Sequence, residues 1–163
     1  MNIGVIRKEE LRQYSHLILP YVCDELGAYE GDLDREYICL YACAENPDGI
    51  LFPVSALIML MEMDGALSVL SVYTLPEYRR RGIASELLDK AVFIARRLFI
   101  FDEDEDEEEI SLKAVYRLSP ARREVFEAFL KKNNFTDFYL LDDSGELKVW
   151  AAISEIRFYQ TGS

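Results

Sequence analysis

The strongest constraint on the fold is a strand–helix–strand–helix run in the middle of the chain. "ALSVLSVYT" (Ala66–Thr74) predicts an apolar strand, and Ile110–Tyr116 predicts another. Between them, a helix from near Ile83 carries its apolar residues in one stripe: Ile83, Leu87, Ala91, Ile94, Ala95 and Leu98. A second helix covers Ser119–Asn133, with Ser119 as N-cap and Pro120 in its first position. Because a helix that joins two strands of one sheet leaves them parallel, part of the sheet must be parallel.

The flanking segments predict antiparallel strands around this run. Asn2–Arg7 is a strand, and an amphipathic helix follows until Pro20 ends or restarts it. Short turns at "NPDG" and "MDG" make a meander of the strands Tyr37–Ala44, Ile50–Met61 and Ala66–Thr74. A hairpin of Asp137–Leu141 and Leu147–Ile153 closes the chain. We therefore expect one α/β (α+β) domain over residues 1–163, with a mixed, mostly antiparallel sheet and helices on both faces.

The charge of the chain is negative and unevenly distributed. The formal net charge is −12, and "DEDEDEEE" (Asp102–Glu109) is an unbroken acidic run. We expect this run to be a solvated loop, with attraction of a cationic partner as the alternative. The acidic composition argues against nucleic-acid binding. No apolar stretch predicts a membrane span or an export signal, so we expect a cytoplasmic protein. We also expect a flexible tail at 158–163.

The cysteines and the histidine do not predict a metal site. Cys23, Cys39 and Cys43 lack CxxC spacing, and Cys39 and Cys43 are too far apart along one strand to bridge. We expect free thiols. His16 is the only histidine, and its surroundings contain no ligand cluster, so we expect a partly exposed helix residue there.

Three arginines and a glycine lie between the strand that ends at Thr74 and the helix that begins near Ile83. Such a turn leaves helix N–H groups without partners, and these groups favour anions. Gly82 allows close approach of the backbone to an anion, and the arginines Arg79, Arg80 and Arg81 add positive charge. The alternative is a surface arginine cluster at an ordinary turn. The segment contains neither a P-loop nor a dinucleotide-binding pattern.

This segment resembles the GNAT superfamily of acyl-CoA-dependent N-acyltransferases. The family pattern [RQ]-x-x-G-x-[GA] is matched by "RRRGIA", with Arg79, Gly82 and Ala84 in the defining positions, and "TLPEYR" (Thr74–Arg79) matches the residues before it. The order of predicted elements also agrees with the family fold over nearly the whole chain. The resemblance implies a V-shaped splay between the fourth and fifth strands, which the cofactor occupies.

The resemblance further implies acetyl-CoA, or another acyl-CoA, as co-substrate and an amine as acceptor, with no metal. The backbone of Arg80–Ser85 would hold the diphosphate, and the edge of Val72–Thr74 would pair with the pantetheine arm. Ser119 and Arg122 are further cofactor contacts. The implied cofactor site therefore comprises Val72, Tyr73, Thr74, Arg79, Arg80, Arg81, Gly82, Ile83, Ala84, Ser85, Ser119 and Arg122.

The catalytic pattern of many relatives is absent. Where they carry a tyrosine acid, this chain has Leu130, and where some carry a glutamate base, it has Ser68. Candidate replacement acids, by strand position, are Tyr116 and Tyr139. Candidate bases, acting directly or through water, are Glu62 and Asp64 in the turn before the strand Ala66–Thr74; for each, a structural role is the alternative. A thiolate leaves readily, so positioning can supply much of the rate.

Three functional hypotheses follow. The first is an N-acetyltransferase that acts on a small-molecule or peptide amine. The acidic run favours a cationic amine. The second is a CoA-binding regulatory module with little or no turnover, suggested by Leu130 and Ser68. The third is an interaction domain that uses the acidic run and does not bind CoA. The chain is expected to be a monomer or a homodimer.

Overall fold

The computed structural model describes residues 1–63, 65–99, 111–116, 118, 120–135, 137–140 and 147–152, and the acidic run 102–109 and the tail 158–163 lie outside them. The element order is the predicted one. The strands and helices are β1 (Asn2–Val5), α1 (Leu11–Tyr14), α2 (Pro20–Ala28), β2 (Tyr37–Glu45), β3 (Leu51–Met61), β4 (Leu67–Thr74), α3 (Ile83–Phe99), β5 (Ser111–Tyr116), α4 (Pro120–Lys132), β6 (Asp137–Leu140) and β7 (Leu147–Ala152).

Prolines begin two helices, as the sequence predicts, and an asparagine follows the end of one. Pro20 and Pro120 are the first residues of α2 and α4. Asn134, just after α4, has a φ of 68°, the left-handed conformation of a helix cap. The predicted helix before Pro20 is instead divided: α1 is a single turn between the 3₁₀ turns Lys8–Glu10 and Ser15–Leu17. The chain between α1 and α2 is thus an irregular connection.

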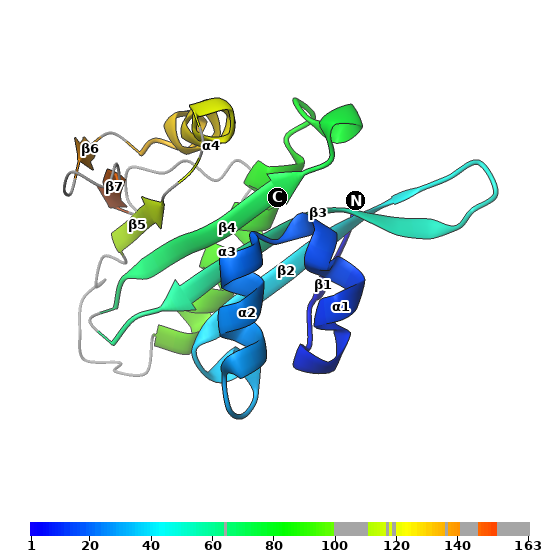
Figure 1. Cartoon of the computed structure of the whole chain (residues 1–163), viewed down its shortest axis with the longest axis horizontal. Coiled ribbons are helices and arrows are strands. Elements are labelled where there is room, and N and C mark those ends of the chain that lie inside the picture. Colours follow the sequence, from blue (N-terminus) through cyan, green and yellow to red (C-terminus); the bar gives the residue numbers. More distant parts are fainter. Residues whose placement is uncertain are drawn as a thin grey trace.

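All the described strands join one mixed sheet in the order β1-β2-β3-β4-β5-β7-β6. The β4–β5 pair is parallel, and the other neighbours are antiparallel. The predicted mostly antiparallel sheet with one parallel step is therefore confirmed. Figure 1 shows α1 and α2 in front of the sheet and α3 behind it.

Each face of the sheet carries its own hydrophobic core. Alternate residues of β2 point to opposite sides: Ile38 and Leu40 pack with α3 and α4, whereas Tyr37 and Cys39 pack with α1 and α2. The apolar stripe of α3 lies in the first core except for Leu98, which is 39% exposed, and this core also receives Phe126 from α4. Because helices cover both faces, the strands are apolar on both sides.

The sheet opens between β4 and β5. These strands pair only at Leu67, Ser68 and Val69 of β4, and the next residue, Leu70, is an extra residue relative to β3, since Ile58 pairs with Ser71 and Met59 with Val69. Such a bulge bends the strand that carries it. From Leu70 to Thr74, β4 therefore has an edge that is unpaired with β5. This is the predicted splay between the fourth and fifth strands.

Candidate functional site

A groove of about 1020 Å³ lies at the open end of the sheet. Four segments line it: the end of β4 (Val72–Thr74), the turn and first residues of α3, one side of α4, and the connection between α1 and α2 (Ser15–Pro20). In Figure 1 the end of β4 and the turn after it lie at the top of the sheet, beside α4. The groove thus extends along the part of β4 that β5 leaves unpaired.

The turn before α3 is folded back onto β4 by Arg79. The Arg79 Nε–H donates a hydrogen bond to the Thr74 carbonyl oxygen at 2.9 Å, and the guanidinium lies over the Tyr73 ring, 5.2 Å from its centroid. Arg80 and Gly82 follow with φ of 66° and 77°, a conformation that is unfavourable for a residue with a Cβ atom. Arg79 therefore orders the turn, and two left-handed residues shape it.

The start of α3 presents backbone donors beside this turn. The first helical bond is donated by the Glu86 N–H to the Gly82 carbonyl at 3.0 Å. The N–H groups of Ile83, Ala84 and Ser85 consequently have no acceptor within the helix, and all three residues line the groove. A Cβ atom at Gly82 would meet no protein atom within 4 Å, so there is open space beside the donors. A helix start with open space before it favours an anion.

Two hydrogen bonds fix the walls of the groove relative to one another. The Asn133 side-chain amide, at the end of α4, donates to Ser85 Oγ at 3.1 Å. The Leu19 N–H, in the α1–α2 connection, donates to Ser71 Oγ at 3.0 Å. Asn133 and Ser71 are both buried, and their partners Ser85 and Leu19 are partly buried, so these bonds are partly shielded from water. The groove is therefore bounded by segments that the interior of the protein holds in place.

The charged side chains that line the groove are mostly positive. Arg79, Arg80, Arg122 and Lys132 face a single lining carboxylate, that of Glu124. This excess is opposite in sign to the formal net charge of the chain, −12. A cationic groove on an acidic protein favours an anionic ligand.

A match to a known protein family shows where this chain belongs. Residues 6–117 match the acetyltransferase (GNAT) family. The chain belongs to the GNAT family. The match includes every helix and strand from α1 to β5, with the turn before α3, and leaves β1 outside. Acyl transfer from an acyl-CoA to an amine is the chemistry of this family.

Solved structures agree with the GNAT fold. A GNAT acetyltransferase from Staphylococcus aureus superposes with a TM-score of 0.63 at 11% identity, covering 93% of this chain and 98% of the other. The PaiA N-acetyltransferase from Thermoplasma acidophilum, in complex with coenzyme A, gives 0.60 at 15% identity, with 93% and 99% covered. The ribosomal-protein-S18-alanine N-acetyltransferase from Escherichia coli gives 0.57 at 15%, with 93% and 91% covered. A search of curated proteins finds no match.

Most of the cofactor residues implied by the GNAT resemblance line the groove. These are Val72, Tyr73, Thr74, Arg79, Arg80, Gly82, Ile83, Ala84, Ser85 and Arg122. Arg81 is outside the lining, and its guanidinium lies over the Tyr78 ring, 5.0 Å from the centroid. Ser119 is outside the described residues. These residues therefore lie along one groove, and the side chains of Arg79 and Arg81 stack on tyrosines of the protein itself.

Tyr116 is not placed to act as an acid at the groove. Its side chain is 2% exposed and packs edge-on against Phe126 in the core shared by α3 and α4. Its hydroxyl donates to Glu127 Oε1 at 2.9 Å. Burial, together with this carboxylate, raises the pKa of Tyr116. Strand alternation explains the position, since Leu112 and Ala114 point to the same core.

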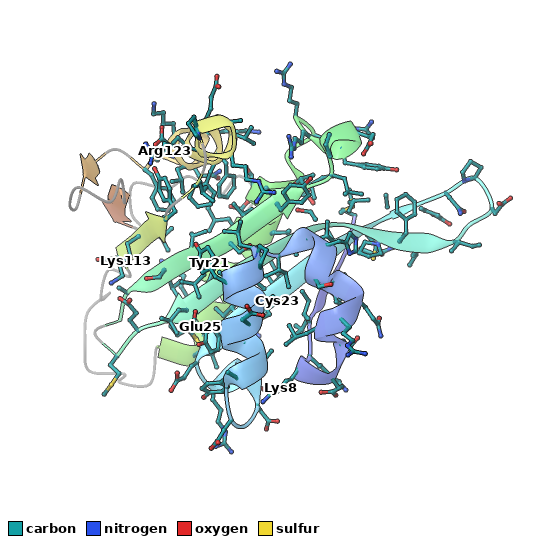
Figure 2. All side chains as sticks on the ribbon, viewed as in Figure 1. Lys8, Tyr21, Cys23, Glu25, Lys113 and Arg123 are labelled. Carbon is teal, nitrogen blue, oxygen red and sulfur yellow. The ribbon has the colours of Figure 1, made fainter. Side chains whose placement is uncertain are left out.

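Glu62 lies at the other end of β4 from the turn. Its carboxylate pairs with Lys113 and accepts a hydrogen bond from Ser68 Oγ at 3.1 Å. Figure 2 shows Lys113 beside the start of β4, far from the turn that follows the strand. Ser68 and Thr74 are about 20 Å apart at about 3.3 Å per strand residue. The antiparallel β3–β4 hairpin therefore carries Glu62 away from the groove.

The remaining catalytic candidates lie beyond what the structure describes. Tyr139 is in β6, where the backbone alone is described, and Asp64 is outside the described residues. The sequence also left several lining residues unassigned. The α1–α2 connection contributes His16, and α4 contributes a half-exposed apolar side, Val125 and Phe129. The signal for the first was Pro20, which interrupts the helical pattern, and for the second the helical spacing of the apolar residues Val125, Phe126, Phe129 and Leu130.

Neither a group of metal ligands nor a membrane-spanning helix is found among the described residues. Among them no group of three or more potential metal ligands is present, and the three cysteines are free thiols. None of the helices in the described ranges has the length and apolar character of a membrane span.

Proposed function

We propose that this GNAT chain transfers an acetyl group from acetyl-CoA to an amine, with the groove as the donor site. One observation supports this most strongly: a single lining connects the unpaired edge of β4 to the start of α3. An extended arm that contains amides can pair with an open strand edge, as peptides do. A diphosphate suits the N–H groups of a helix start in a cationic groove.

Each wall has a role in this proposal. The backbone of Arg80–Ser85 holds the diphosphate, Val72–Thr74 pair with the pantetheine arm, and Arg122 contacts the cofactor from α4. Arg81 contributes its backbone, because its side chain is stacked on Tyr78. Ser119 is retained as a proposed contact on the sequence resemblance alone.

The reaction proposed is direct attack. A neutral amine attacks the thioester carbonyl, and the oxyanion is stabilised by a backbone N–H of β4. The C–S bond then breaks and the thiol leaves. Leu130 is fully buried in the core, so the position at which many relatives carry a tyrosine acid cannot supply a proton here. Positioning of the two substrates therefore supplies much of the proposed rate.

Two measurements test the proposal. Calorimetry with CoA and the wild-type chain is expected to show saturable binding, and thiol release from acetyl-CoA in the presence of amines is expected to show turnover. A wild-type protein without affinity for CoA would refute the proposed function, and would favour an interaction domain.

A CoA-binding regulatory module is the second candidate. Two observations favour it: Leu130 replaces the acid, and the Ser68 hydroxyl at the base position is engaged by Glu62. Tight CoA binding without thiol release, over a panel of polyamines, lysine peptides and aminoglycosides, would favour this candidate over the enzyme.

For the acceptor, we propose a cationic small-molecule or peptide amine. The support is the acidic run Asp102–Glu109, which would raise the local concentration of cations. A chain in which this run is shortened should show a higher KM for spermidine at low salt, and the difference should shrink as salt is added. We further propose one domain over residues 1–163, cytoplasmic, monomeric or homodimeric, with no nucleic-acid or membrane partner.

A further inference from the structure

The α1–α2 connection brings the only histidine of the chain to the groove. His16 lies in the 3₁₀ turn Ser15–Leu17 and lines the same groove as Val72–Thr74. Its side chain is exposed, whereas the two residues after it, Leu17 and Ile18, are buried. The imidazole is therefore on the solvent side of a segment whose next residues are anchored in the core.

The connection is attached to β4 at the point where the sheet opens. The Leu19 N–H donates to Ser71 Oγ at 3.0 Å, and Ser71 follows the bulged residue Leu70. Ser71 is fully buried and immediately precedes Val72, the first groove residue of β4. His16 is three positions before Leu19, so this bond holds its segment beside the part of β4 that is proposed to pair with the pantetheine arm.

The imidazole is available for proton transfer. Among the described residues, no side chain forms a hydrogen bond or ion pair with His16. Imidazole is the side chain that gains and loses protons most readily near neutral pH. Other charged or titratable groups share the groove: Tyr73 on β4, Tyr78, Arg79 and Arg80 in the turn, and Arg122, Glu124 and Lys132 on α4. Glu124 is thus the one other base in the described lining at neutral pH.

We propose that His16 is the proton acceptor and donor of the transfer reaction. The proposal rests on the proposed function. The amine nitrogen bonds to the thioester carbonyl carbon, and the neutral imidazole takes the N–H proton. The C–S bond breaks, sulfur leaves with the electron pair as a thiolate, and the imidazolium returns the proton to it. The products are the amide and CoA thiol, with His16 neutral again, so one group serves as base and then as acid.

The single histidine makes the first experiment direct. In proton NMR the chain has one imidazole signal set, which His16→Gln removes. Adding acetyl-CoA to the wild type should shift this signal. The change in chemical shift should saturate over the same range of ligand concentration as the binding measured by calorimetry. If CoA binds by calorimetry and the signal does not move, the inference fails while the proposed function stands. If CoA does not bind, the proposed function itself fails.

The second experiment measures turnover with spermidine and with a lysine peptide. His16→Gln should lower kcat by roughly 100-fold or more and leave the Kd for CoA within about twofold. It should also remove the acidic limb of the profile of kcat against pH. Gln13→Ala, an exposed change one turn earlier, is the matched control and should behave as wild type.

The alternative base is tested in parallel. If Glu124→Gln removes the acidic limb and His16→Gln does not, Glu124 is the base and the inference is wrong. An unchanged kcat in His16→Gln would also overturn it. Should the wild type turn over neither amine, the NMR result alone decides whether the imidazole contacts the bound donor.

Discussion

Gly82→Ala separates two roles of this glycine. One is to adopt a positive φ in the turn, and the other is to leave space for the proposed diphosphate. Gly82 has a φ of 77°, where a Cβ atom costs about 1–2 kcal/mol of unfolding free energy. Its Cβ would meet no protein atom within 4 Å, so there is no packing penalty to add. In the ligand-bound state, however, this methyl group occupies the space proposed for the diphosphate. We expect the Kd for CoA to rise at least about tenfold, or about 1.4 kcal/mol.

Gly65→Ala is a matched control for the backbone cost. Gly65 has a φ of 86° and equally open surroundings, but it lies in the turn between β3 and β4, at the opposite end of β4. Urea unfolding should show a similar loss of stability in both variants, and calorimetry should show weaker CoA binding in Gly82→Ala alone. Equal CoA affinity in the two variants would refute the placement of the diphosphate. Gly82→Asp, which adds a negative charge, should abolish binding and leave a folded protein.

Three further variants test the surroundings. Arg79→Met removes a charge-assisted hydrogen bond to the end of β4 and should lower the unfolding free energy by about 1.5–3 kcal/mol in urea. Tyr116→Phe should cost about 1 kcal/mol, because Glu127 loses its donor, and should keep kcat; a large drop in kcat would restore Tyr116 as an acid. Burial raises the pKa of Asp89 to about 6. The folded chain therefore holds this proton more tightly than the unfolded chain, and stability should fall as pH rises from about 4 to 6. Asp89→Asn should flatten that dependence in urea unfolding at several pH values.

Local sequence patterns were sufficient for most of the elements and for the turn that lines the groove. Helix α3 follows from the spacing of its apolar residues, and the starts of α2 and α4 from Pro20 and Pro120. The turn that includes Gly82 was recognised because positive charge, glycine and a helix start occur together there. These signals act over a few residues, so they can be read without knowing the tertiary structure.

The distance of each catalytic candidate from the groove depends on which face and which end of its strand the residue occupies. Alternation along β5 places Tyr116 on the same side as Leu112 and Ala114, so its burial was predictable. The direction of the β3–β4 hairpin likewise separates Glu62 from the turn after β4. The sequence places Tyr116 in a strand and Glu62 in the turn before β4, but the distance of each from the groove depends on which face or which end of the sheet it occupies.

The bulge in β4 could not be predicted from alternation along the strand. After the bulge, each residue faces the core opposite to the one that alternation along an unbroken strand would give. Val69 and Val72 are three apart, yet both pack in the core of α3, whereas Leu70 and Tyr73 pack in the core of α2. An unbroken strand would place Val69 and Val72 on opposite faces. Only the pairing with β3 reveals the extra residue, so the position of Ser71, and with it the attachment of the His16 segment, could not be predicted.

The three-residue contact between β4 and β5 has a consequence for the behaviour of the protein in solution. It leaves an open backbone edge within the sheet from Leu70 to Thr74. Unprotected edges pair with extended segments of other chains, which is how many proteins begin to aggregate. An acyl-CoA bound along β4 would cover this edge as a paired strand would. We therefore expect the co-substrate to act as a solubility factor, with light scattering on mild heating delayed by CoA in the wild type and not in Gly82→Asp.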